Sequence, residues 1–143
     1  MSTQENKTLA RQLYEDIFSQ GKMALIDEIF DTDYVNHDTS GPPEGWPRGK
    51  QGFHAVAGSY RTAIPDITFT IEEQVAEADR VVTRWTARGT NTGSLAGLPP
   101  TGKTAVVRGM SIERIAGGKI AESWVNFDQF GMLQQLGIIP SQG

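Results

Sequence analysis

The segment TAVVRGMSIERIAGGKIAESWVNF, residues 104–127, decides the fold. Apolar and polar side chains alternate along it, which is typical of strands with one buried face. The pair Gly117-Gly118 interrupts the alternation, and two glycines between such segments favour a tight hairpin turn. We therefore expect two long antiparallel strands, one over residues 104–115 and one over residues 119–127.

Two more strands are expected upstream of this hairpin. Ile67, Phe69 and Ile71 alternate with polar residues, and residues 81–90 form a second extended run. Between this run and the hairpin, residues 91–103 are rich in Gly and Pro and predict a loop. The second half of the chain is therefore expected to be an antiparallel meander.

The first part of the chain shows helical spacing instead. Ser2-Thr-Gln-Glu5 offers a capping box, and the apolar stripe that follows continues to Phe18, with Gly21 as the expected stop. A second short helix is predicted within residues 23–30. A third helix is predicted to end before Pro65, because proline cannot continue a helix.

A long loop, residues 38–52, separates the second and third helices and is dense in Gly and Pro. It contains Trp46, so we expect it to fold over another part of the molecule. Three helices followed by antiparallel strands define an α+β layout. We expect one domain, residues 1–143, in which a strongly curved, mixed or antiparallel sheet wraps around three N-terminal helices and encloses a cone-shaped cavity.

The composition excludes several classes of function. The net charge is −4 and the 13 basic residues are scattered, which argues against a nucleic-acid surface. The chain has no cysteine, so thiol nucleophiles and thiolate metal sites are excluded. The N-terminal residues are polar, and no apolar run approaches the roughly 20 residues that span a bilayer. We expect a cytoplasmic protein with no membrane partner.

Asp128 stands between the last strand and a helix predicted over residues 129–136. Strand alternation puts Trp124 and Asn126 on the same face as Asp128. The carboxylate has two possible roles. It can cap the following helix, or it can act as an acid/base group whose pKa is raised by apolar neighbours in a pocket. The two roles do not exclude each other.

Three other side chains are candidate ligand contacts. His37 opens the long loop, where it can lie at a pocket mouth or cap a turn. Tyr14 belongs to the apolar stripe of the first helix, where it is either a core residue or a donor to a substrate oxygen. Arg84 and Trp85 face opposite ways, and if Arg84 faces inward it needs a carboxylate partner, for which Glu122 and Asp128 are the candidates.

Motifs of other chemistries are absent from the sequence. There is no G-x-S-x-G elbow, no G-x-G-x-x-G after a strand and no Walker loop. The two histidines lack H-E-x-x-H spacing, so no metal site is predicted. The remaining possibilities are cofactor-free acid/base chemistry and ligand binding alone.

The sequence resembles the SnoaL-like polyketide cyclase family, within the nuclear-transport-factor-2-like superfamily. The resemblance covers nearly the whole chain. The segments that carry it are Tyr34-Val-Asn-His37, Val82-Thr-Arg-Trp-Thr-Ala-Arg-Gly-Thr90, Gly97-Leu-Pro-Pro-Thr-Gly102, Gly118-Lys-Ile-Ala-Glu-Ser-Trp124, Asp128 and Gln135-Leu-Gly137.

This resemblance implies an intramolecular aldol ring closure of a polyketide ester, with no cofactor or metal and with Asp128 as general acid/base. The ligand implied by the resemblance is a small hydrophobic or polyketide-like molecule. Asn91 stands where many relatives have His, and an amide can donate a hydrogen bond but cannot exchange a proton near pH 7. The implied substrate contacts are His37, Tyr14, Trp124, Asn126, Arg84, Asn91 and Trp46.

Other functions on the same fold stay open. Epoxide hydrolysis uses an Asp-Arg-Asp arrangement with an arginine and an aspartate two residues apart on a strand, and neither Arg84 nor Arg108 has such a neighbour. Proton transfer of the ketosteroid isomerase type would use Tyr14 as oxyanion donor with Asp128 beside it, and a further carboxylate, such as Asp38, as base. A non-catalytic protein that binds an apolar ligand is the third alternative.

The resemblance also implies a homodimer or homotetramer, because the convex sheet face of such folds commonly packs against another subunit. Outward-facing apolar residues would form the contact. We expect these to include Val81, Trp85 and Val107.

Overall fold

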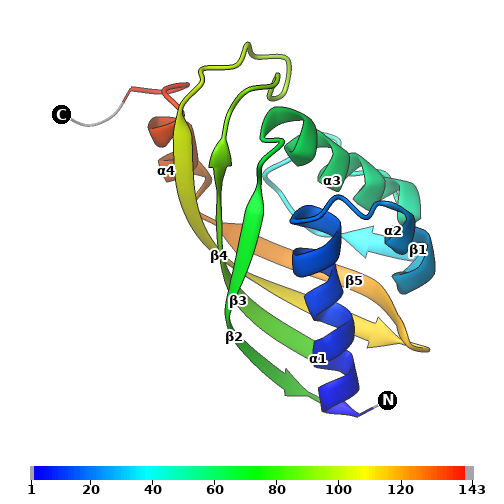
Figure 1. The fold of residues 1–143 in the computed structure, drawn as a ribbon. Helices are drawn as coiled ribbons and strands as arrows, with labels where there is room; N and C mark the ends of the chain where they lie inside the picture. Colours follow the sequence, from blue (N-terminus) through cyan, green and yellow to red (C-terminus); the bar gives the residue numbers. More distant parts are fainter. Residues whose placement is uncertain (1, 141–143) are drawn as a thin grey trace.

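The computed structural model describes residues 2–140 and shows one five-stranded sheet in the order β1-β5-β4-β3-β2. β1 runs parallel to β5, and all other neighbours are antiparallel, so the sheet is mixed. It curves strongly around the helices (Figure 1). The strands are β1 (Phe30–Asn36), β2 (Thr68–Glu77), β3 (Arg80–Thr90), β4 (Thr104–Ala116) and β5 (Lys119–Phe127).

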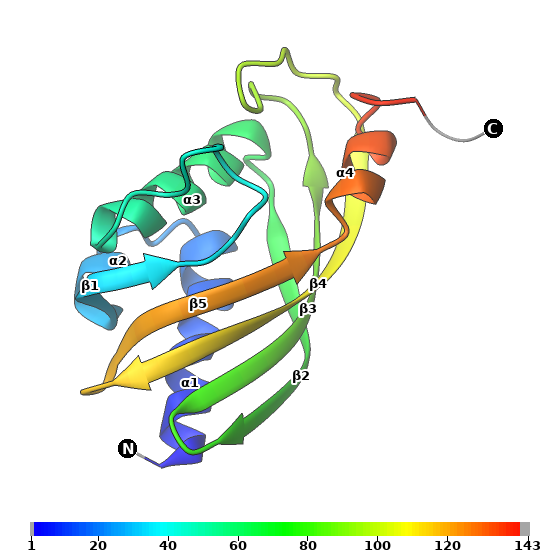
Figure 2. The ribbon, with the colours of Figure 1, turned by 180° about the vertical axis from the view of Figure 1, so that it is seen from behind.

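The helices cover the concave face of the sheet, and β1 lies beside β5 at one edge (Figure 2). The predicted capping box is confirmed: Ser2 Oγ accepts a hydrogen bond from the Glu5 backbone N–H, and Glu5 Oε1 accepts one from the Ser2 N–H. The helices are α1 (Thr3–Gln12), the π-helix η1 (Leu13–Phe18), α2 (Ala24–Ile29), α3 (Lys50–Ala63) and α4 (Gln129–Gln135). The α+β fold, with a curved mixed sheet around N-terminal helices, is therefore confirmed.

The β4–β5 hairpin forms as predicted. Gly117 and Gly118 have φ angles of 58° and 75°, a region that favours glycine and suits a tight turn. Along β4 the odd-numbered residues face the helices and the even-numbered residues face away, as the alternating burial shows. This alternation places Ser111 and Glu113 on the concave side.

Trp85 on β3 faces inward and is 5% exposed, whereas Arg84 faces outward. The indole packs over Gly109 on β4, its partner in the strand register. A Cβ atom at Gly109 would lie 2.5 Å from the Trp85 ring, so only glycine leaves room for this packing. The indole Nε1 donates to Ser111 Oγ at 2.9 Å.

The expectation that Val81, Trp85 and Val107 form an outward contact surface is wrong. All three are buried on the concave side, because the strand alternation points odd-numbered residues of β3 and β4 toward the helices. The exposed apolar side chains of the convex face include instead Val75 and Met110.

Candidate functional site

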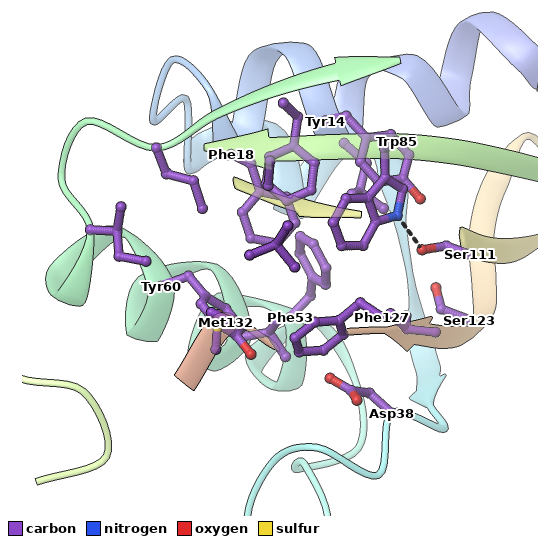
Figure 3. A pocket seen from close by; sticks show the side chains of 18 of the residues that line it. Tyr14, Phe18, Asp38, Phe53, Tyr60, Trp85, Ser111, Ser123, Phe127 and Met132 are labelled. Carbon is purple, nitrogen blue, oxygen red and sulfur yellow. Dashed lines mark hydrogen bonds between the residues drawn. The ribbon is translucent and has the colours of Figure 1, made fainter. Parts of the chain in front are cut away.

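A cavity lies between the concave face of the sheet and the helices, and its wall is mostly apolar (Figure 3). The cavity volume is about 80 Å³, counted as the space open to the centre of a water molecule. By the same measure a single water needs roughly 10–15 Å³. There is thus room for a small organic molecule. The helices contribute side chains such as Phe18, Phe53 and Val56, and the sheet contributes Phe69 and Trp85.

One region of the cavity wall is polar and centres on Glu113. Its carboxyl group projects inward from β4 and the residue is 1% exposed. Tyr14 reaches it from η1, and the phenol Oη donates a hydrogen bond to Glu113 Oε1 at 2.8 Å. Tyr14 itself is 2% exposed. A carboxyl group and a phenol therefore meet in a water-poor environment at the wall of the cavity.

This environment shifts the pKa values of both groups. Burial raises the pKa of Glu113 to about 7, although the hydrogen bond from Tyr14 acts in the opposite direction. Burial, together with the nearby Glu113 charge, holds the pKa of Tyr14 well above its ordinary value. At neutral pH Tyr14 is therefore a hydrogen-bond donor, and Glu113 is populated both with and without its proton.

The π-helix explains how Tyr14 comes to this place. Its wide turn is closed by the backbone N–H of Ser19, which donates to the Tyr14 carbonyl oxygen at 3.1 Å, and Ser19 Oγ donates to the same oxygen. Ser19 Oγ also accepts from the Phe69 N–H at 2.9 Å, which ties the turn to β2. Single π-turns within helices occur frequently at functional sites.

Asp38 is a second carboxyl group at the cavity wall. It follows β1 and is 8% exposed. Its Oδ1 accepts hydrogen bonds from the Ser40 backbone N–H at 2.9 Å and from Ser40 Oγ at 2.6 Å, which fix its orientation. Figure 3 shows Asp38 below the Phe127 ring, apart from Ser111 and Trp85.

Asp128 does not line this cavity. It is exposed and caps α4, with Oδ1 accepting a hydrogen bond from the Gly131 N–H at 2.9 Å. Its place in the alternation turns Phe127 toward the cavity and Asp128 away from it. The capping interpretation is confirmed, and the expectation that the side chain faces the pocket is corrected.

Three of the expected substrate contacts also lie on the convex face, and His37 packs beside them. The His37 ring stacks on Trp124 with centroids 5.1 Å apart, and His37 Nε2 lies 2.6 Å from Glu122 Oε2. Asn126 is exposed on the same strand. Arg84 Nε contacts Glu73 Oε1 at 3.3 Å. None of these four side chains lines the cavity, because strand alternation directs them away from it.

Asn91 and Trp46 are likewise outside the cavity wall. The Asn91 amide is fully buried and donates to the carbonyl oxygens of Ala63 at 3.1 Å and Gly93 at 2.8 Å. Its role here is to hold the loop after β3 against the end of α3. Trp46 is partly buried and packs over Gly41, so the long loop folds over the core as expected. Of the eight predicted site residues, only Tyr14 lines the cavity.

Sequence reasoning missed Glu113, although a signal was present. Glu113 occupies an odd-numbered position of β4, on the face that carries Val107 and Ile115. A carboxylate on the apolar face of an alternating strand is expensive to bury, so it indicates a specific role.

Neither a metal-binding cluster nor a membrane-spanning helix is found within residues 2–140. No group of three or more His, Cys, Asp or Glu side chains in this range is arranged to hold a metal ion. Among the same residues, no helix has the length and apolar character needed to cross a membrane.

The profile of the SnoaL-like polyketide cyclase family matches residues 8–136, so the chain belongs to this family. IdmH from Streptomyces antibioticus, a proposed polyketide cyclase, is 32% identical, with a TM-score of 0.77 over 92% of this chain and 98% of that one. A proposed polyketide cyclase from Acidithiobacillus ferrooxidans is 28% identical, with a TM-score of 0.83 over 96% and 99%.

TsrD from Streptomyces laurentii has the same fold, with a TM-score of 0.85 at 23% identity over 97% of this chain and 99% of that one. No curated protein sequence matches the chain. The family membership therefore rests on the profile match and on the similarity to solved structures.

The buried carboxyl group should make stability depend on pH. Because the folded-state pKa of Glu113 is raised to about 7, the folded protein keeps this proton between pH 4.5 and 7 while the unfolded chain loses it. Stability from this group is therefore present below pH 4.5 and is lost as the pH rises through 7. The total loss should be about 3 kcal/mol of unfolding free energy.

Urea unfolding of wild type and Glu113→Gln over this pH range measures the effect. The difference in unfolding free energy between the two should change across pH 4.5–7 and level off above it. Glu77→Gln, at the exposed end of β2, controls for the loss of one carboxylate. Parallel profiles for wild type and Glu113→Gln would show that Glu113 titrates in its ordinary range.

Proposed function

We propose that this protein is a cofactor-independent enzyme that moves a proton beside a carbonyl group of a small, mostly apolar molecule, with Glu113 as the proton-transfer residue. The observation that carries the proposal is the Glu113 carboxyl, buried at the wall of an apolar cavity with a pKa raised to about 7. A general acid/base works best when its pKa lies near the working pH. Membership of the SnoaL-like polyketide cyclase family supports a polyketide-like substrate.

Intramolecular aldol ring closure is the reaction that we assign to this site. The Glu113 carboxylate takes a proton from a carbon flanked by carbonyl groups, and the resulting enolate carbon attacks a second carbonyl carbon of the same molecule. A new carbon–carbon bond forms, and the electron pair of that carbonyl moves to its oxygen. The alkoxide then takes the proton from Glu113. No atom is gained or lost, so no co-reactant is needed.

Tyr14 is a positioning residue in this scheme. Its hydrogen bond fixes one oxygen of the Glu113 carboxyl and lowers the pKa that burial would otherwise raise further. The apolar walls would fold the substrate and keep water from the enolate. A carbon acid between two carbonyls is already fairly acidic, so a carboxyl group with a pKa near 7 is a sufficient base.

Paired variants of the two candidate carboxylates test the assignment. In deuterated buffer, Glu113→Gln should slow the exchange of the α-hydrogens of a neutral ketone such as β-tetralone by about 100-fold or more, because a general base is removed. Asp128→Asn should keep exchange near the wild-type rate and lose only some helix stability. In wild type, the exchange rate should rise with pH and level off above about 7.

Nuclear magnetic resonance follows the exchange directly. If exchange is unchanged in Glu113→Gln but lost in a folded Asp128→Asn, the proton-transfer residue is Asp128, as the family resemblance implies, and not Glu113. Equal, uncatalysed rates in all three proteins, together with stabilisation by the ketone, would indicate a binding protein without catalysis.

We further propose that a second copy of the chain covers the convex sheet face. An apolar row crosses four strands in register there, from Val75 through Val82 and Ile112 to Trp124. The rows on both sides carry glutamates and arginines together, including the pairs Glu73–Arg84 and Glu122–Arg114. A face with a central apolar row and both charge signs at its margins can complement itself across a two-fold axis.

Light scattering after gel filtration tests this contact. Wild type should have twice the 15.6 kDa mass of one chain. Met110→Glu, beside the apolar row and 52% exposed, should be a monomer. Phe130→Glu, an equally exposed change on α4, should keep the wild-type mass. A monomeric wild type, or a Met110→Glu variant of unchanged mass, would contradict the contact.

A further inference from the structure

Two hydroxyl groups at the polar region of the cavity lack a hydrogen-bond partner. Tyr34 is fully buried and Ser123 is 2% exposed, and both side chains line the cavity. Within residues 2–140, neither Tyr34 Oη nor Ser123 Oγ makes a hydrogen bond of ordinary length and angle, although Ser123 lies near enough to Tyr34 and Glu113 to lower the pKa of both. Buried polar groups are nearly always hydrogen-bonded, and a ligand that enters the cavity can supply the partner that this pair needs.

The two hydroxyls belong to neighbouring strands close to Glu113. Ser123 on β5 is the register partner of Glu113 on β4 and also pairs with Asn36 on β1. Tyr34 lies two residues before Asn36 on β1, and burial, together with the charges of Glu113 and Asp38, raises its pKa above the ordinary value. Tyr34 thus keeps its proton and can donate it in a hydrogen bond.

The other polar side chains of this region are already engaged. Tyr14 donates to Glu113, the Trp85 indole donates to Ser111, and Asp38 accepts from Ser40. Tyr34 Oη and Ser123 Oγ are thus the buried hydroxyls of this region that make no hydrogen bond of ordinary geometry within residues 2–140. Two donors on adjacent strands suit one oxygen atom that accepts two hydrogen bonds, as a carbonyl or enolate oxygen does.

The charges at the cavity wall select against an anionic ligand. Glu113 and Asp38 are both buried carboxyl groups that line the cavity. Among residues 2–140, the only cationic residue of the lining is Arg88, which is exposed and therefore hydrated. A carboxylate ligand would lose its hydration and meet two acidic groups without a buried cation to pair with.

We infer that Tyr34 Oη and Ser123 Oγ form a binding subsite for the carbonyl oxygen of an uncharged ligand. This inference deepens the proposed function, because the same cavity would hold the substrate, and it assigns the substrate to neutral ketones and esters rather than free acids. The subsite would hold the oxygen beside Glu113, where the negative charge of an enolate develops.

Three naphthalene probes of similar size separate the contribution of a neutral carbonyl oxygen to binding from the contributions of charge and of apolar contact. Acetylnaphthalene carries a neutral carbonyl, naphthoate carries a carboxylate, and ethylnaphthalene carries no oxygen. Titration calorimetry at pH 8 should show wild type binding the ketone about tenfold or more tightly than either of the others, because only the ketone satisfies both hydroxyls without introducing a charge.

Tyr34→Phe and Ser123→Ala should each weaken binding of the ketone by about threefold to tenfold, the usual range for one hydrogen bond. Both should leave binding of ethylnaphthalene unchanged. Tyr60→Phe removes another phenol of the cavity lining and should not weaken ketone binding. Without ligand, Tyr34→Phe should melt at a temperature no lower than that of wild type, because the Tyr34 hydroxyl makes no hydrogen bond of ordinary geometry that the substitution could remove.

Equal affinity of wild type for the ketone and the hydrocarbon would overturn the subsite, as would equal losses in Tyr60→Phe and Tyr34→Phe. Tight binding of naphthoate would overturn the assignment to uncharged ligands. No binding of the ketone at its solubility limit would also count against the subsite. These outcomes are separate from the exchange experiment, because ketone binding does not require Glu113 to transfer a proton.

Discussion

The hydrogen bond between Tyr14 and Glu113 is the interaction on which this site depends. It joins the π-turn after α1 to the C-terminal part of β4 across the interior, and both residues are almost completely buried. Burying the carboxyl group without a hydrogen-bond partner would strongly destabilise the folded protein, and the phenol alone would also lack a partner. Together they allow an ionisable group to persist at the wall of an apolar cavity, where its pKa is raised to about 7.

The curvature and alternation of the sheet determine which side chains take part. The concave face carries Glu113, Ser111 and Ser123, and it also carries Trp85 over Gly109. The convex face carries the charged and apolar rows that are free to meet another protein. The alternation of side chains thus directs Glu113 to the concave face and the charged and apolar rows to the convex face. A shift of register by one residue would exchange the two sets of side chains.

Sequence reasoning predicted the α+β fold, the hairpin at Gly117-Gly118 and the cap formed by Asp128, because each depends on local patterns. It predicted the wrong direction for Asp128, since the alternation fixes which residues share a face but not which face is inside. Glu113 could have been found from its place on the apolar face of β4. Its contact with Tyr14 could not, because 99 residues separate the two and the π-turn has no sequence signal that we recognised.

The most direct test of the central claim is the titration of Glu113 itself. Nuclear magnetic resonance of the protein with carbon-13-labelled glutamate side chains should show one carboxyl group that titrates at about pH 7 and is missing in Glu113→Gln. In Tyr14→Phe the same group should titrate at higher pH, because a hydrogen bond that favours the charged form is lost. If every glutamate titrates near its ordinary value of 4.5, Glu113 is not a proton-transfer group poised for neutral pH, and the account is contradicted.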